Sequence, residues 1–282
     1  MTPSVPPPAP DPAFRTPRTR PPVGGRRDRI TVAYDGTDFL GWQRQPAAPT
    51  VQGEIEAALA RLTGEHPDVH SCGRTDAGVH AYGQVAHFDL ARPWAAPALQ
   101  KALNAVLPES VRIRALRPAA PTFHARYDAL GKEYRYIVYN APVADPCLRR
   151  VALHIRAPLD LAAMRAAAAL LVGTHDFAAF SANPHREIGG TVRTLYRLEI
   201  ASRGPIVVIR AVGDGFLYKM VRSLAGHLLR VGRHAVPVAE TADILASRAR
   251  TARVETAAPH ALSLHRIHYR GAAWQRPAGD KE

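Results

Sequence analysis

Hydrophobic residues in the first half of the chain alternate between strand-like and helix-like spacing. The run from Ile30 to Tyr34 is rich in β-branched and aromatic residues and predicts a strand. The segment Val51 to Leu62 has Ile55, Leu59 and Leu62 at helical spacing and predicts a helix. The same reasoning predicts further strands at 69–72, 84–90, 111–116 and 134–139, and a second helix at 96–106.

The second half repeats this alternation after a segment, Asn140 to Pro158, whose prolines break the periodicity. Asp160 is placed to cap a helix that runs to Val172. An antiparallel strand pair is expected at 191–202 and 206–212, a helix at 218–231 and a final strand at 262–269. Both halves thus follow a β-α-β-β-α-β-like order, which predicts an α/β (α+β) fold with helices packed on mostly antiparallel sheets.

Composition and periodicity together predict four segments. Residues 1–28 are rich in Pro and Arg and lack an apolar run, so we expect a disordered, polyproline-like basic arm and no secretory signal. Residues 29–140 are predicted to form an N-terminal α/β domain, 141–275 a C-terminal α/β domain and 276–282 a short tail. The loop from Phe180 to Thr191, with its paired glycines, is predicted to be mobile.

The charge balance favours a polyanionic partner. The chain carries a net charge of +13, and its pI is near 10.4. The first 29 residues contribute +4 of this, which leaves +9 on the remaining chain. The basicity is therefore not confined to the arm, although a basic surface that binds nothing would also explain it.

Cysteine and histidine spacing excludes some other classes of protein. Cys72 and Cys147 have no paired spacing, so neither a disulfide framework nor a cysteine zinc site is expected, and a reducing cytoplasm fits. His70, His80 and His87 include no tight ligand pair, so we expect no metal. No apolar stretch approaches the roughly 20 residues that span a bilayer, so no membrane association is expected.

One loop carries the strongest candidate chemistry. The octapeptide Gly73-Arg74-Thr75-Asp76-Ala77-Gly78-Val79-His80 lies between two predicted strands. Glycines on both sides of Asp76 allow a sharp turn that exposes its carboxylate. Arg74, two positions away, would favour the ionised form, which can act as nucleophile or base. The alternative is a hairpin turn in which Asp76 only caps backbone amides.

This octapeptide resembles the catalytic loop of the tRNA pseudouridine synthase A family. Other blocks resemble that family in the same order and together span roughly residues 30 to 270: Tyr34–Gln45, Thr50–Glu56, Phe123–Arg126 with Lys132–Tyr136, and Gly213–Arg222. Two positions depart from the family's common pattern. Asp128 stands where a small hydroxyl residue is common, and Ser223 stands where Asn is common.

The resemblance implies an isomerase that converts uridine to pseudouridine in the anticodon stem-loop of tRNA, at tRNA positions 38, 39 and 40. It implies the pseudouridine synthase fold, with two ferredoxin-like halves around a central catalytic cleft, and a cytoplasmic homodimer. Because the product is an isomer of the substrate, we expect no redox or nucleotide cofactor. An RNA-binding module without catalysis and an N-glycosidase that releases uracil are the two alternatives.

The resemblance also assigns roles to particular residues. Asp76 is implied to be the catalytic carboxylate, Arg222 its basic partner, and Tyr134 the residue that stacks on the flipped base or moves protons. Whether Asp76 attacks C6, attacks C1′ or abstracts a sugar proton stays open. Residue patterns alone also allow Tyr134 to be a core aromatic, and Arg222 with Lys219 to be a solvated basic helix face.

Several further residues are candidates for weaker roles. Phe39 is expected in the core, Trp42 in the core or against RNA, and Asp89 at the surface. Each candidate for RNA binding would, taken alone, be ordinary surface charge. These candidate substrate contacts are Arg74, Arg126, Lys132 and Lys219.

Overall fold

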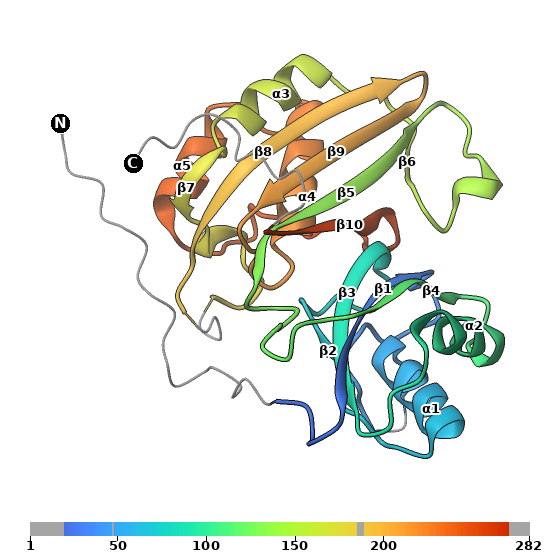
Figure 1. The fold of residues 1–282 in the computed structure, drawn as a ribbon. Coiled ribbons are helices and arrows are strands. Elements are labelled where there is room, and N and C mark those ends of the chain that lie inside the picture. Colours follow the sequence, from blue (N-terminus) through green and yellow to red (C-terminus); the bar gives the residue numbers. More distant parts are fainter. Residues whose placement is uncertain (1–19, 47, 185–188, 271–282) are drawn as a thin grey trace.

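The computed structural model describes residues 20–46, 48–184 and 189–270 (Figure 1). Most of the predicted basic arm, the predicted tail at 276–282 and the centre of the predicted mobile loop at 180–191 lie outside the described residues. Within the described residues, no helix has both the length and the apolar character needed to cross a membrane.

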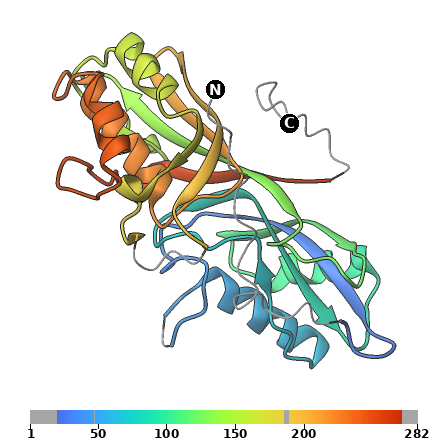
Figure 2. The same cartoon turned by 90° about the vertical axis from the view of Figure 1, so that its left-hand side faces the viewer.

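In the described part of the chain, a single mixed sheet of ten strands connects the two halves. Its main path runs β4-β1-β3-β10-β5-β9-β8-β7, with β2 paired to β3 and β6 paired to β5. Figure 1 shows β10 between the strands of the two halves, and Figure 2 shows the same junction after a quarter turn. Near its start, β10 pairs in parallel with β3, at Ser263 opposite His80. The last strand of the chain therefore joins the first half of the sheet to the second.

The first half has the predicted β-α-β-β-α-β order and a ferredoxin-like strand order, β4-β1-β3-β2. Its first helix begins where the Thr50 hydroxyl accepts a hydrogen bond from Gly53 N, and it ends at Gly64 in the left-handed conformation. The elements are β1 (Arg26–Tyr34), α1 (Val51–Thr63), β2 (His70–Ser71), β3 (His80–Leu90), α2 (Ala96–Val106) and β4 (Val111–Pro118).

The second half repeats this strand order as β10-β5-β9-β8, with β7 added at the edge. Asp160 caps α3 as predicted, because its carboxylate accepts a hydrogen bond from Ala163 N. The elements are β5 (Ala129–Asn140), β6 (Leu153–Ile155), α3 (Leu161–Ala169), β7 (Gly173–Asp176), β8 (Val192–Arg203), β9 (Ile206–Gly213), α4 (Met220–Gly232), α5 (Glu240–Ser247) and β10 (Leu262–Tyr269).

Several predicted boundaries are wrong. The structured part of the first half begins by Arg26, so residues 26–28 belong to β1 and not to the arm. Strand β3 begins at His80, before the predicted Gln84. Helix α3 ends at Ala169, three residues before the predicted end at Val172. There Leu170 N and Leu171 N donate to Ala167 O and Ala168 O, a tighter turn that ends the helix before β7 begins at Gly173. Helix α5 was not predicted. The division into two domains near residue 140 stays a prediction.

The early start of β1 has an electrostatic reason. The guanidinium of Arg27, whose side chain is only 1% exposed, binds both carboxylate oxygens of Asp89 on β3 at 2.8 and 2.7 Å. It also donates to the carbonyls of Pro121 and Phe123. Asp89 therefore serves a buried structural ion pair and not the predicted surface role.

Three imidazoles pack together beside the segment that follows β4. The ring of His87 lies 5.2 Å from that of His70 and 4.8 Å from that of His124, measured between ring centroids. Its Nδ1 accepts a hydrogen bond from Ala125 N at 3.2 Å. Burial, together with the neighbouring His124, Arg27 and His70, lowers the pKa of His87 from 6.5 to about 3. His87 is therefore neutral in the folded protein at physiological pH.

This burial predicts a specific acid sensitivity. Between pH 6.5 and about 3 the unfolded chain protonates His87 and the folded chain does not, so the free energy of unfolding falls as pH falls. The limiting slope for one group is about 1.4 kcal/mol per pH unit. We expect His87→Gln, which cannot titrate, to lack this part of the slope. In urea unfolding at pH 7, 6 and 5, the difference in free energy of unfolding between wild type and variant should become smaller as the pH falls. A difference that stays constant with pH would contradict the prediction.

Candidate functional site

A cleft of about 1140 Å³ lies where the two halves meet. Its walls come from the loop before β3, the start of α1, strand β5 and the segment that enters α4. All seven predicted site residues line this cleft, and five of them are basic. The seven residues are Arg74, Asp76, Arg126, Lys132, Tyr134, Lys219 and Arg222.

Hydrogen bonds of Thr75 hold the loop that carries Asp76. Thr75 O accepts a hydrogen bond from Trp42 N at 3.2 Å, and the Thr75 hydroxyl bonds the Tyr34 hydroxyl at 2.8 Å. The neighbouring Gly41 approaches so closely that a Cβ there would lie 2.5 Å from Thr75 O. The loop thus has a fixed position against the first half, and the side chain of Asp76 remains 21% exposed toward the cleft.

The partner of Asp76 comes from the second half of the chain. Arg222 on α4 donates from Nη1 to Asp76 Oδ2 at 2.9 Å, and from Nε to Ala257 O at 2.8 Å. Its side chain is 12% exposed, so this charge-assisted hydrogen bond is largely shielded from water. The predicted contact between Asp76 and Arg222 is therefore present. Arg74 is exposed and is not the partner of Asp76.

Tyr134 forms the apolar floor of the cleft. It is 8% exposed on β5, and its ring meets that of Phe216 edge-on, with 5.3 Å between centroids. Burial raises the pKa of the Tyr134 hydroxyl above its usual range, and nearby Tyr34, Cys72 and Asp76 raise it further. Tyr134 is therefore a neutral phenol with an O–H to donate.

The four candidate substrate contacts differ in how firmly they are held. Arg74 and Arg126 are exposed. Lys132 is partly buried and donates from Nζ to Cys72 O at 3.2 Å. Lys219 lies 5.0 Å from the centroid of the Tyr218 ring. It precedes α4 with a φ of 58°, so the prediction that it lies on the helix with Arg222 is wrong, although both line the cleft.

Sequence reasoning missed three groups at this site. Phe216 supports Tyr134 and lies inside the Gly213–Arg222 motif, so its position there was a usable signal. Arg193 lines the cleft, but it comes from β8 with no local pattern to mark it. The carbonyl of Ala257 holds Arg222 and is a backbone group that no sequence pattern identifies. Phe39 lies in the core as predicted; Trp42 is 1% exposed and lies at the cleft wall.

The two departures from the family pattern both make local hydrogen bonds. Asp128 Oδ2 accepts from His124 N at 2.9 Å, which closes the turn that carries Arg126. The Ser223 hydroxyl accepts from Arg250 Nη1 at 2.7 Å. Neither side chain lines the cleft.

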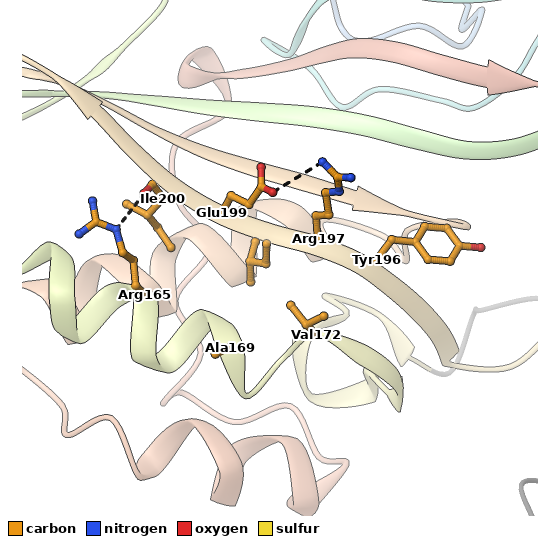
Figure 3. A pocket seen from close by; sticks show the side chains of 8 residues that line it. Arg165, Ala169, Val172, Tyr196, Arg197, Glu199 and Ile200 are labelled. Carbon is orange, nitrogen blue, oxygen red and sulfur yellow. Dashed lines mark hydrogen bonds and ion pairs between the residues drawn. The ribbon is translucent and has the colours of Figure 1, made fainter. Parts of the chain in front are cut away.

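A metal centre and a second groove are the alternatives to this cleft. Within the described ranges, no three His, Cys, Asp or Glu side chains are grouped so that they could hold a metal ion. A smaller groove of about 440 Å³ lies between α3 and β8 (Figure 3). There Arg165 donates to Ile200 O and Arg197 pairs with Glu199. Its charged groups are thus engaged with their own wall, and the cleft at Asp76 is the better candidate.

Comparison with known proteins shows the family to which this chain belongs. The family model described as tRNA pseudouridine synthase matches residues 30–128 and 167–270. A tRNA pseudouridine synthase A of Brevibacillus brevis is 47% identical over 245 residues, which cover 86% of this chain and 100% of the relative. Proteins of the same name from Moorella thermoacetica and Chlamydia felis are 44% and 43% identical, over 86% of this chain and 98% and 92% of their own lengths. The chain therefore belongs to the tRNA pseudouridine synthase family.

Proposed function

We propose that this chain isomerises uridine to pseudouridine in tRNA, with Asp76 as its catalytic carboxylate. The observation that carries the proposal is the ion pair of 2.9 Å between Asp76 and Arg222, at a cleft that Tyr134 also lines. Family membership supports the reaction, and the geometry supports the assignment of these three residues to it.

The reaction needs little besides a positioned carboxylate. The N1–C1′ bond breaks, the uracil turns and a C5–C1′ bond forms. The hydrogen on C5 leaves to water as a proton, and N1 takes up a proton, so the product is an isomer of the substrate. No electrons are gained or lost, so no oxidant or reductant enters the balance. One carboxylate acting as nucleophile or base is sufficient to assist the cleavage.

The set of carboxylates argues against an N-glycosidase. Glycoside hydrolases generally use two carboxyl groups that flank the scissile bond. Asp68 is the other acidic residue that lines the cleft, and its side chain is 69% exposed and lies 3.7 Å from Arg44. Among the described residues that line the cleft, there is therefore no second buried acid beside Asp76, which favours an isomerase that retains its base.

Arg222 and Tyr134 act on Asp76 and on the base in different ways. The guanidinium of Arg222 fixes one carboxylate oxygen and leaves the other oxygen of Asp76 for the substrate. The neutral ring of Tyr134, supported by Phe216, offers a face for the flipped uracil and an O–H that can donate a hydrogen bond. A nucleotide reaches this depth only after it leaves its stack.

The substrate surface is basic. Arg74, Arg126, Lys132 and Lys219 line the cleft and are placed to contact phosphates, which position RNA without reading its sequence. The resemblance to the family supports targets at positions 38, 39 and 40 of the anticodon arm. It also supports a homodimer and a cytoplasmic location.

Replacing Asp76 tests the function directly. In tRNA transcript labelled with tritium at uracil C5, isomerisation must release tritium to water. We expect Asp76→Asn to bind tRNA within about 3-fold of wild type and to lower tritium release by at least about 1,000-fold. Asp68→Asn, at the exposed carboxylate of the same cleft, is the matched control and should keep its activity. Binding that falls in step with release would assign Asp76 a structural role, and release of free uracil would indicate a glycosidase.

Salt dependence tests the phosphate contacts. If Arg126 binds one phosphate, Arg126→Ala should make the salt dependence of tRNA binding less steep. The slope of the logarithm of the association constant against the logarithm of the salt concentration should fall in magnitude by about 0.7–0.9. The exposed Arg203 lies at the end of β8 and outside the cleft, so Arg203→Ala should leave the slope unchanged. Equal slopes for Arg126→Ala and wild type in filter-binding measurements would remove Arg126 from the RNA contacts.

A further inference from the structure

Arg250 is a second arginine tied to the catalytic ion pair, although it does not line the cleft. Its Nη1 donates to the Ser223 hydroxyl at 2.7 Å and to Phe180 O at 3.3 Å. Its Nη2 donates to Val254 O at 3.0 Å and to the Thr256 hydroxyl at 2.7 Å. One guanidinium thus connects α4, the segment after β7 and the loop that leads to β10.

The environment of Arg250 is unusual for a cation. Burial lowers its pKa, and no carboxylate among the described residues offsets that burial. A partly buried charge held only by neutral acceptors costs stability that an apolar side chain would not cost. The four hydrogen bonds compensate this cost and fix the geometry of the groups that accept them. Arg250 therefore acts through the positions of the groups that accept its hydrogen bonds.

The loop 250–257 packs directly on α4. Arg222 O accepts a hydrogen bond from Ala257 N at 3.1 Å, and Arg222 Nε donates to Ala257 O at 2.8 Å. One turn further along the helix, a Cβ at Gly226 would lie 2.2 Å from Glu255 O. The loop therefore contacts the helix without an intervening side chain, and Arg250 anchors it at both Val254 and Thr256.

The position of Ala257 decides where Arg222 points. One edge of the Arg222 guanidinium is occupied by Ala257 O and the other by Asp76 Oδ2. If the loop moved away from α4, Nε would lose its acceptor and the guanidinium would be free to rotate away from the carboxylate. Long arginine side chains lose much rotamer freedom when they are fixed, so the hydrogen bond to Ala257 O is needed to hold Arg222 in this orientation.

We propose that Arg250 is a positioning residue for the reaction: it fixes the loop 250–257 on α4, so that Ala257 O orients Arg222 toward Asp76. This inference rests on the proposed function of the Asp76 cleft. It assigns Arg250 no contact with RNA.

A double-mutant cycle distinguishes positioning from simple stabilisation. We expect Arg250→Met to lower kcat about 10- to 100-fold while tRNA binding stays within about 2-fold, because only the orientation of Arg222 changes. In an Arg222→Gln background the same change should lower kcat by less than about 2-fold, since the group through which Arg250 acts is gone. If the fold-losses of kcat in the two single variants multiply in the double variant, the two residues act independently and the proposal is overturned.

Arg230 provides a matched control. It lies on the same helix and donates to Arg253 O in the same loop, four residues before Ala257. Arg230→Met should lower the melting temperature without lowering kcat. If it lowers kcat as much as Arg250→Met, general loosening of the loop explains both variants. Should Arg250→Met fail to fold, Thr256→Val removes one anchor alone and should reproduce a smaller loss of kcat, and no loss would count against the proposal.

A readout without activity separates the inference from the proposed function. The Arg222 Nε–H, bonded to Ala257 O, should give a nitrogen–proton NMR signal that exchanges slowly with water. We expect that signal to be lost in Arg250→Met and kept in Arg230→Met. If wild type releases no tritium, the proposed function fails while this test still decides the orientation of Arg222. A signal retained in Arg250→Met would refute the positioning role.

Discussion

The ion pair between Arg222 and Asp76 is the contact on which the functional site depends. The two residues are 146 positions apart in the chain, and one belongs to a loop of the first half and the other to a helix of the second. Neither half can form this pair alone. The continuous sheet, with β10 placed between β3 and β5, sets the distance between the halves at which the pair closes.

Backbone strain contributes to the same geometry. Lys219 precedes α4 with a φ of 58°, a left-handed conformation that a residue with a side chain adopts at a cost of order 1–3 kcal/mol. Hydrogen bonds from Ala182 N to Tyr218 O and from Ser223 N to Lys219 O hold this entry to the helix. The sharp turn lets Lys219 and Arg222 line the same cleft although only Arg222 lies on α4. Strain of this kind is expected where a functional site over-determines the backbone.

Local periodicity was enough to predict most elements, because α2 buries one face and most of β9 alternates regularly between buried and partly exposed residues. It failed where tertiary contacts set the boundary. The first residues of β1 are ordered by the ion pair of Arg27 with Asp89, which no local pattern reveals. The motif blocks predicted the contact of Asp76 with Arg222. The roles of Ala257 O and Arg250 could not be predicted, because they depend on where a backbone carbonyl and a distant guanidinium lie in space.

Arg222 serves catalysis through Asp76 in this mechanism, whereas a purely structural Arg222 would only join the halves. The most direct measurement is the single-turnover rate of tritium release by Arg222→Gln at saturating enzyme, together with its dissociation constant for tRNA. We expect a rate at least about 100-fold below wild type with a dissociation constant within about 3-fold, because the pair acts on the reacting groups and not on RNA binding. A normal rate, or a loss of rate fully explained by weaker binding, would contradict the catalytic role of Arg222.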